Sequence, residues 1–174
     1  MRRPDASPPP DHAARAAEAL LILVAAIFVV LGTHGGNLQD TANSRLATVW
    51  SLVHRGTWEI STPPGAPVNP FERGTVDKVE IEGKRLSSKP PILPLLMTAE
   101  YWVMHHALSW NLEDPEIRPR IVYWMTLTLV GAAYLLCLVF FSRIVGLFMD
   151  APWIRGFLVF ILAFCTQLPG LATD

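Results

Sequence analysis

The hydrophobic residues of the chain gather in long uncharged blocks. Residues 19–33 form the first block, residues 121–142 the second and residues 156–173 the third, and none of them contains Asp, Glu, Lys or Arg. A helix needs roughly 20 mainly apolar residues to cross the hydrocarbon core of a bilayer. The pattern therefore predicts an all-α membrane protein with about three transmembrane helices, which we assign to residues 16–33, 121–142 and 156–173.

The first block follows a polar, proline-rich segment. We expect residues 1–15 to form a disordered cytoplasmic tail, because such a composition cannot bury an apolar core. The block is short for a span, so a cleaved signal peptide is the alternative interpretation. The long leading segment and the absence of a clean small-x-small cleavage site favour an uncleaved signal anchor.

The charges that flank the predicted spans set the expected orientation. Basic residues in short loops prefer the cytoplasmic side of the membrane. Such residues precede the first span and also occupy the short link 143–155, and they are Arg2, Arg3, Arg15, Arg143 and Arg155. We therefore predict a cytoplasmic loop over residues 143–155 and an extracytoplasmic loop over residues 34–120.

The predicted outer loop opens with an amphipathic segment at residues 40–55. Its apolar residues recur at helical spacing, namely Ala42, Leu46, Val49, Trp50 and Val53, and this spacing predicts a surface helix. Gly56 is a suitable terminator. Asp40 stands at the start of the segment, where a carboxylate that caps free backbone amides is the purely structural interpretation.

Residues 92–110 are apolar but carry Glu100 near the middle and a histidine pair near the end. A spanning helix would bury an unpaired carboxylate in lipid, whereas a helix on the membrane surface keeps it in water. We favour a second interfacial helix over residues 92–110.

Between these helices, residues 78–87 alternate around Glu82-Gly83, which predicts a small β-hairpin. The acidic residues Asp77, Glu80 and Glu82 are interpreted as a solvated face. The hairpin leads to Lys89, which two prolines follow, close to the predicted membrane surface. Lys89 is there either a binder of lipid phosphate or a lysine that snorkels at an interface.

Composition agrees with a membrane protein and excludes some partners. Apolar residues make up 51% of the chain and charged residues only 17%, with a mean hydropathy of +0.33, against roughly 25% charged residues in an ordinary soluble domain. A net charge of -1 provides no basic face for nucleic acid. The two cysteines lie in apolar stretches and are interpreted as small hydrophobic residues. The histidines have no metal-ligand spacing, so no metal site is predicted.

Several short segments resemble one family by their order along the chain. They are residues 40–47 (DTANSRLA), Gly56-Thr57-Trp58, Ser88-Lys89-Pro90-Pro91, an arginine just before the second span (Arg118 or Arg120) and Arg143 at its far end. This order resembles the start of GT-C-type membrane glycosyltransferases, in the branch that includes protein mannosyltransferases and the lipid A aminoarabinose transferase. The resemblance covers about residues 16–173.

The resemblance implies a function for the outer loop. Asp40 corresponds to the catalytic acid that orients or deprotonates an acceptor, and Arg45 and Lys89 correspond to the basic residues that hold the phosphate of a polyprenyl-phosphate-linked sugar. It also implies the bacterial inner membrane, with loop 34–120 on the extracytoplasmic face. The expected partners are membrane lipid, the polyprenyl-phosphate sugar and an acceptor whose identity the sequence leaves open. No cofactor is indicated, and the need for a divalent metal stays open.

Members of this family have more spans than the three predicted here. We therefore expect the chain to be the N-terminal part of a larger enzyme and to lack transferase activity by itself. The main alternative is a non-catalytic membrane assembly or binding module that acts through its outer loop. In that case Asp40 and Lys89 are replaceable, whereas the apolar stripe at Leu46, Trp50 and Val53 is not.

Overall fold

The protein is described by a computed structural model, in which residues 12–35 and 40–165 are placed. The chain divides into two compact units: a helical unit from residues 1–32 and 130–174, and a loop unit from residues 33–129. The predicted tail lies mainly outside the described residues. Its boundary at residue 15 is wrong, because α1 (His12–Gly32) already begins at His12.

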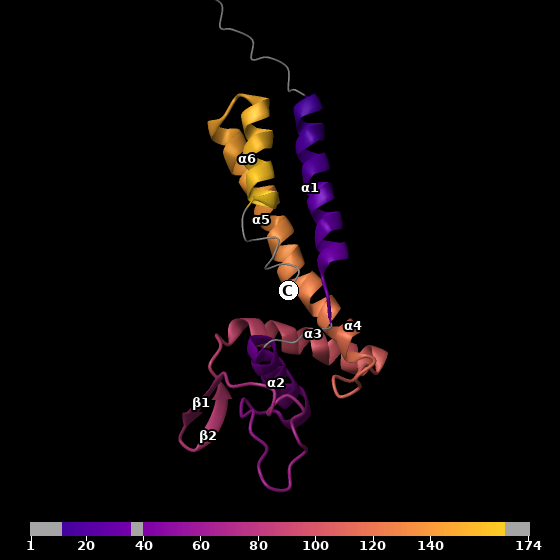
Figure 1. The fold of residues 1–174 in the computed structure, drawn as a ribbon, viewed down its shortest axis with the longest axis vertical. Helices are drawn as coiled ribbons and strands as arrows, with labels where there is room; N and C mark the ends of the chain where they lie inside the picture. The colour runs from indigo at the N-terminus through magenta and orange to yellow at the C-terminus, as the bar shows by residue number, and fades with distance from the viewer. Residues whose placement is uncertain (1–11, 36–39, 166–174) are drawn as a thin grey trace, which may run out of the picture. The chain divides into compact units, whose positions relative to one another are not determined.

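The helical unit consists of α1, α5 (Ala132–Phe148) and α6 (Pro152–Phe164), which pack against one another (Figure 1). Small and branched apolar residues are buried where the helices meet, and they are Ala25, Val29, Leu138, Val159 and Ala163. Large apolar side chains point outward from all three helices, among them Leu31, Phe140 and Phe157. An apolar outer surface is what a lipid environment requires of a membrane helix.

An ion pair lies inside this unit. Glu18 of α1 accepts a hydrogen bond from Ser142 at 2.7 Å and pairs with Arg155 of α6 at 3.0 Å. The Glu18 side chain is only 8% exposed. A side chain added at Gly146 would meet the Arg155 guanidinium at 3.3 Å, so the glycine leaves room for it. Arg155 is therefore a packing residue of three helices and not a residue of a cytoplasmic loop.

The second predicted span is longer than expected. Helix α4 (Arg118–Met125), a π-helical segment η1 (Thr126–Gly131) and α5 follow one another as a single apolar helix of 31 residues. The predicted cytoplasmic loop 143–155 is therefore wrong over most of its length, and only residues 149–151 link α5 to α6. The prediction ended the helix at a charge, but arginine is a good helix former and apolar residues continue beyond it.

Two helices are long and apolar enough to cross a membrane, by length and composition: Arg15–Gly32 and Arg118–Phe148. Helix α6 has 13 residues and falls short of that length. Its predicted extent, 156–173, starts too late because Pro152 opens the helix, a position at which proline is well accepted. The end of that prediction lies outside the part of the chain that the structure describes.

The loop unit contains α2 (Asp40–Arg55), the antiparallel pair β1 (Lys78–Ile81) and β2 (Lys84–Ser87), and α3 (Ile92–Leu108). The predictions of a helix at 40–55 and of a hairpin at 78–87 are confirmed. At the hairpin turn, Glu82 and Gly83 both have positive φ angles, of 53° and 76°, which is the type I′ geometry that matches strand twist. Helix α3 ends two residues before the predicted 110.

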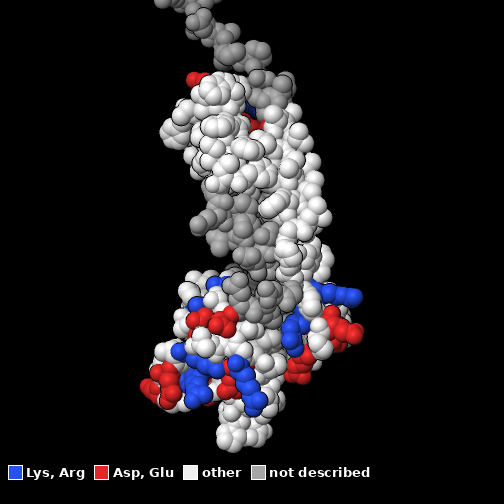
Figure 2. Space-filling model, in the orientation of Figure 1, with Lys and Arg blue, Asp and Glu red and all other residues white. Residues whose placement is uncertain are grey.

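The core of the loop unit forms where α2 and α3 pack together. Its members come from both helices, from the connecting loops and from the start of α4, and include Leu46, Trp50, Ile60, Phe71, Tyr101, Leu112 and Ile121. The apolar stripe of α2 therefore packs inside this unit. On the face that Figure 2 shows, charged side chains gather on the loop unit, and few are visible on the helical unit.

Candidate functional site

The structure brings Lys89 and Asp77 together. The Lys89 ammonium lies 2.9 Å from Oδ2 of Asp77, and the two side chains are 24% and 27% exposed. Asp77 precedes β1 and Lys89 follows β2, so hairpin pairing places both residues at the open end of the hairpin. There Lys78 pairs with Ser87. The ion pair is thus a consequence of strand register.

The backbone around Asp77 is fixed by several hydrogen bonds. Its carbonyl accepts from the Ser44 hydroxyl at 2.8 Å and from the Ser88 amide at 3.2 Å, and its own amide donates to the Thr75 hydroxyl at 3.1 Å. The Thr41 hydroxyl donates to the carboxylate at 3.2 Å. Two residues of α2 therefore hold the segment that carries Asp77.

Arg45 belongs to the same cluster. It follows Ser44 on α2, is half-buried, and is close enough that its charge acts on Asp77. A hydrogen bond from Lys89, with smaller contributions from Thr41 and Arg45, lowers the pKa of Asp77 below its usual value, although partial desolvation opposes the shift. The cluster of Arg45, Asp77 and Lys89 carries one net positive charge. We refer to these three residues as the basic site.

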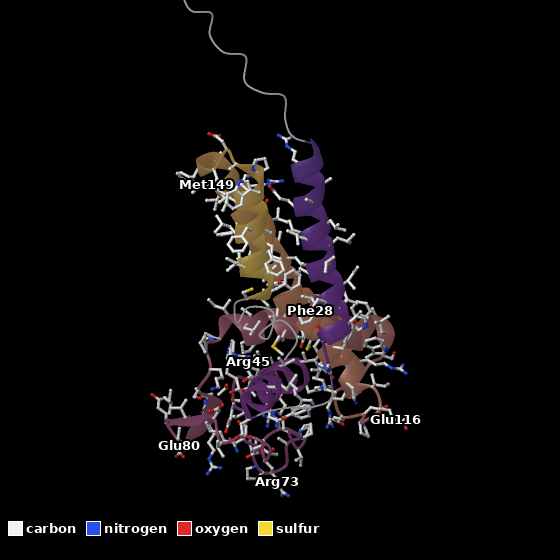
Figure 3. The ribbon with its side chains drawn as sticks, turned by 45° about the horizontal axis from the view of Figure 1, so that its top comes forward. Phe28, Arg45, Arg73, Glu80, Glu116 and Met149 are labelled. Carbon is white, nitrogen blue, oxygen red and sulfur yellow. The ribbon has the colours of Figure 1, made fainter. Side chains whose placement is uncertain are left out.

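Asp40 is not one of these three residues, but its backbone is linked to that of Asp77 through the Thr75 hydroxyl. It is an exposed residue in the first turn of α2, where a carboxylate is favourable because the helix dipole is positive there. Its backbone carbonyl accepts from the Thr75 hydroxyl at 3.0 Å. Because Asp40 is within the helix, the five residues to Arg45 separate the two by roughly 140° around the axis. Figure 3 labels Arg45 on this helix.

Asp77 is the site residue that the sequence interpretation missed. It was grouped with Glu80 and Glu82 as a solvated face, and this is wrong for Asp77. Glu80 does lie on the exposed hairpin (Figure 3), 4.0 Å from Arg85, with both side chains more than half exposed. The periodicity of residues 78–87 could have placed Asp77 opposite Ser88, but contact with α2 depends on tertiary packing.

A second cluster joins α2 and α3 through aromatic rings. His54 stacks on Trp50 with ring centres 4.9 Å apart, and its ring centre lies 5.0 Å from that of His105. Nε2 of His54 and the Tyr101 hydroxyl are 3.1 Å apart, and that hydroxyl accepts from the Leu112 amide. The indole of Trp50 donates to Glu113 at 3.0 Å.

Burial lowers the pKa of His54 below 6.5, and the neighbouring His105 adds to the shift, while Glu113 opposes it. Neutral His54 is thus the form that the fold prefers. Among the described residues, no group of three or more histidine, cysteine, aspartate or glutamate side chains is arranged to hold a metal ion. The cluster is a packed group of side chains that contains the two imidazole rings of His54 and His105.

The two carboxylate oxygens of Glu100 on α3 have different surroundings. Its Oε1 accepts a hydrogen bond from Thr128 at 2.6 Å, while Oε2 is buried without a partner among the described residues. Burial raises the pKa of Glu100, although the Thr128 bond opposes the shift. The expectation that this carboxylate stays wet is therefore only partly correct.

Comparison with protein-family models, with curated proteins and with solved structures returns no match.

Proposed function

We propose that this chain is the N-terminal part of a membrane glycosyltransferase that uses a polyprenyl-phosphate-linked sugar on the extracytoplasmic face. The observation that supports the proposal most is that the charges of Arg45 and Lys89 both act on the same carboxylate. These residues are 44 positions apart in the sequence, and the resemblance singled out both as binders of lipid phosphate. In the structure both act on one carboxylate, that of Asp77.

The basic site has the chemistry that a phosphate leaving group needs. Two positive side chains can stabilise the negative charge that the lipid phosphate gains as the glycosidic bond breaks. Lysine supplies a compact charge and arginine a planar donor fork. In this proposal Asp40 takes the proton from the acceptor as it attacks the anomeric carbon. The exposure of Asp40 supports access for an acceptor from water.

The proposal also places α3 on the membrane surface, where a lipid-linked donor would arrive. The apolar helix that begins at Arg118 is roughly 46 Å long, against a hydrocarbon thickness of about 30 Å. If its last 20 residues, 129–148, cross the hydrocarbon, Thr128 lies at the interface. Glu100 of α3 accepts a hydrogen bond from Thr128, so the middle of α3 lies near that level in this proposal. Its outward side chains include Leu95, Leu96, Trp102 and Val103, each more than half exposed.

A second candidate function is a non-catalytic membrane assembly or binding module. The observation in its favour is the burial of the α2 stripe, since Leu46 and Trp50 are each 1% exposed and so are essential to the fold of the loop unit. The two candidates differ in what they require of Asp40 and Lys89. The transferase needs both residues, and the module needs neither.

The test is Asp40→Asn in the full-length protein, with donor turnover as the readout and expression level in the membrane as the control. We expect turnover to fall at least about 100-fold, the lower range for loss of a general base, at unchanged expression. Glu80→Gln is the matched control, since it removes an exposed carboxylate from the same unit. Unchanged turnover in Asp40→Asn would remove this residue from the mechanism.

A further inference from the structure

We infer that Asp77 is an internal substitute for the phosphate anion: it occupies Lys89 in the empty site and is displaced when a phosphate group binds. The inference rests on the proposed function, because it assigns Lys89 to phosphate. It adds a residue that neither the sequence pattern nor the resemblance pointed to. The ligand chemistry is a phosphate anion, borne either by a polyprenyl lipid or by free phosphate.

The geometry of the pair fits a replaceable partner. The ammonium group of lysine has three donors, and Asp77 is the single ion-pair partner of Lys89 in the described part of the chain. About a quarter of each side chain is exposed, so an anion can approach the pair from solvent. A phosphate oxygen that takes the place of Oδ2 would pair with the same ammonium group, and the positive charge of Arg45 would attract it.

The frame around Asp77 does not depend on its charge. Ser44, Ser88 and Thr75 bond its backbone atoms, and these bonds remain when the carboxylate becomes an amide. Ser44 also shares a 2.6 Å hydrogen bond with Ser87 of β2, and the amide of Lys89 donates to Ser87. Hydrogen bonds that do not involve the Asp77 carboxylate therefore connect α2 to Lys89. We expect Asp77→Asn to remove the negative charge and to leave the fold intact.

Competition by an internal carboxylate has a defined effect on affinity. A ligand that binds only when the partner is displaced has its apparent affinity reduced by the fraction of molecules in the open state. Removal of the carboxylate charge abolishes that reduction, so phosphate should bind more tightly to Asp77→Asn than to the wild type. A residue that merely supports the site would have the opposite effect, because its loss would weaken binding.

The experiment measures the dissociation constant of undecaprenyl phosphate in detergent micelles, with inorganic phosphate as a second arm, for the 174-residue chain and its variants. We expect the dissociation constant of Asp77→Asn to be about fivefold lower than that of the wild type, because no internal carboxylate then occupies Lys89. Asp77→Glu keeps the charge, and Glu80→Gln is the matched control. The dissociation constants of both variants should stay within about twofold of the wild-type value. Circular dichroism checks the fold, and Asp77→Ser replaces the asparagine variant if that variant does not fold.

The outcomes separate the inference from the proposed function. If Asp77→Asn weakens binding or leaves it unchanged while Lys89→Met abolishes it, Asp77 is not a displaced anion, and the phosphate role of Lys89 stands. If Lys89→Met binds as the wild type does, the phosphate role of Lys89 fails. Tighter binding of the lipid alone identifies a lipid phosphate as the ligand, whereas equal gains for both arms identify the phosphate group itself as sufficient.

Discussion

The two units of this protein each contain an ion pair of almost the same length, and the two pairs differ in their surroundings. Lys89 and Asp77 are 2.9 Å apart in the loop unit, and Arg155 and Glu18 are 3.0 Å apart in the helical unit. The side chain of Asp77 is 27% exposed and that of Glu18 only 8%. The two cations are equally exposed, at 24% each, so the pairs differ in the burial of the acid and not in their length.

The partners of the two carboxylates support the same distinction. Glu18 is bonded by Ser142 of α5 and by Arg155 of α6, so its carboxylate connects three helices. Asp77 is bonded by Thr41 and Lys89 and is otherwise held through its backbone. We therefore expect the Glu18 pair to matter for stability and the Asp77 pair to matter for binding.

The largest expected effect is that of Arg155→Met on the helical unit. Removal of one partner of a buried ion pair leaves an uncompensated charge, which costs about 3 to 5 kcal/mol. Unfolding in mixed micelles of increasing dodecyl sulfate content, followed by circular dichroism, measures the loss. Arg143→Met is the matched control, because Arg143 is an exposed arginine of α5.

The double variant Glu18→Gln with Arg155→Met sharpens this test. Since it leaves no buried charge, it should be more stable than Arg155→Met alone. If both variants lost the same stability, the arginine would act through packing against Gly146 and not through its charge.

The next effect is acid destabilisation of the loop unit through His54. The pKa of His54 in the folded protein is lowered from 6.5, so the unfolded chain binds the proton more readily. The contribution of neutral His54 to the free energy of unfolding is fully present above pH 6.5. It is lost as the pH falls from there through the pKa of His54 in the folded protein. Chemical unfolding at a series of pH values should show a smaller decline between pH 7.5 and 5.5 for His54→Gln than for the wild type. An identical decline would show that other groups are responsible.

A third prediction concerns the two helices of the loop unit that were both expected at the membrane surface. Helix α2 buries its stripe in the core, whereas α3 keeps apolar side chains outside. In protein that lacks native cysteines, a spin label at Leu96→Cys should be relaxed mainly by oxygen in lipid nanodiscs. A label at Val76→Cys, another exposed apolar position, should be relaxed mainly by a water-soluble nickel complex. Equal nickel access at both positions would remove α3 from the membrane surface.

The smallest expected effect is that of Lys89→Met on stability. A partly exposed ion pair contributes little because solvent screens it and its side chains lose entropy when they are held. The thermal midpoint of the loop unit should change less than the wild type changes between pH 7.5 and 5.5. A larger loss would make Lys89 a structural residue and would count against the contrast between the two ion pairs.

Local sequence patterns predicted the local structure well. Helix 40–55 and the hairpin at 78–87 follow from short-range spacing and a Glu-Gly turn, and both were confirmed. The end of α5 and the start of α6 differ from the prediction, because Arg143 and Arg155 lie inside these helices and do not end them. Arg155 is instead accommodated by Glu18, a partner 137 residues away that no local pattern reveals.

The same limit applies to the candidate site. The resemblance points to Arg45 and Lys89, whereas the hydrogen bonds that join α2 to the hairpin segment depend on tertiary packing. Asp77 could not be identified in this way, because an acid next to an alternating segment usually lies on a solvated face. Its contacts with Ser44 and Thr41 of α2 arise only in the folded structure.

The most direct test of the account is the sidedness of two positions, Asp40 and Lys89, in the intact membrane. Single cysteines are introduced at each position in a background with Cys137→Ser and Cys165→Ser, and a membrane-impermeant maleimide is applied to cells and to inverted vesicles. The account predicts that both positions react from the extracytoplasmic side and neither from the cytoplasmic side. Labelling of the two positions from opposite sides would contradict it, because a shared site for acceptor and lipid phosphate could not then exist.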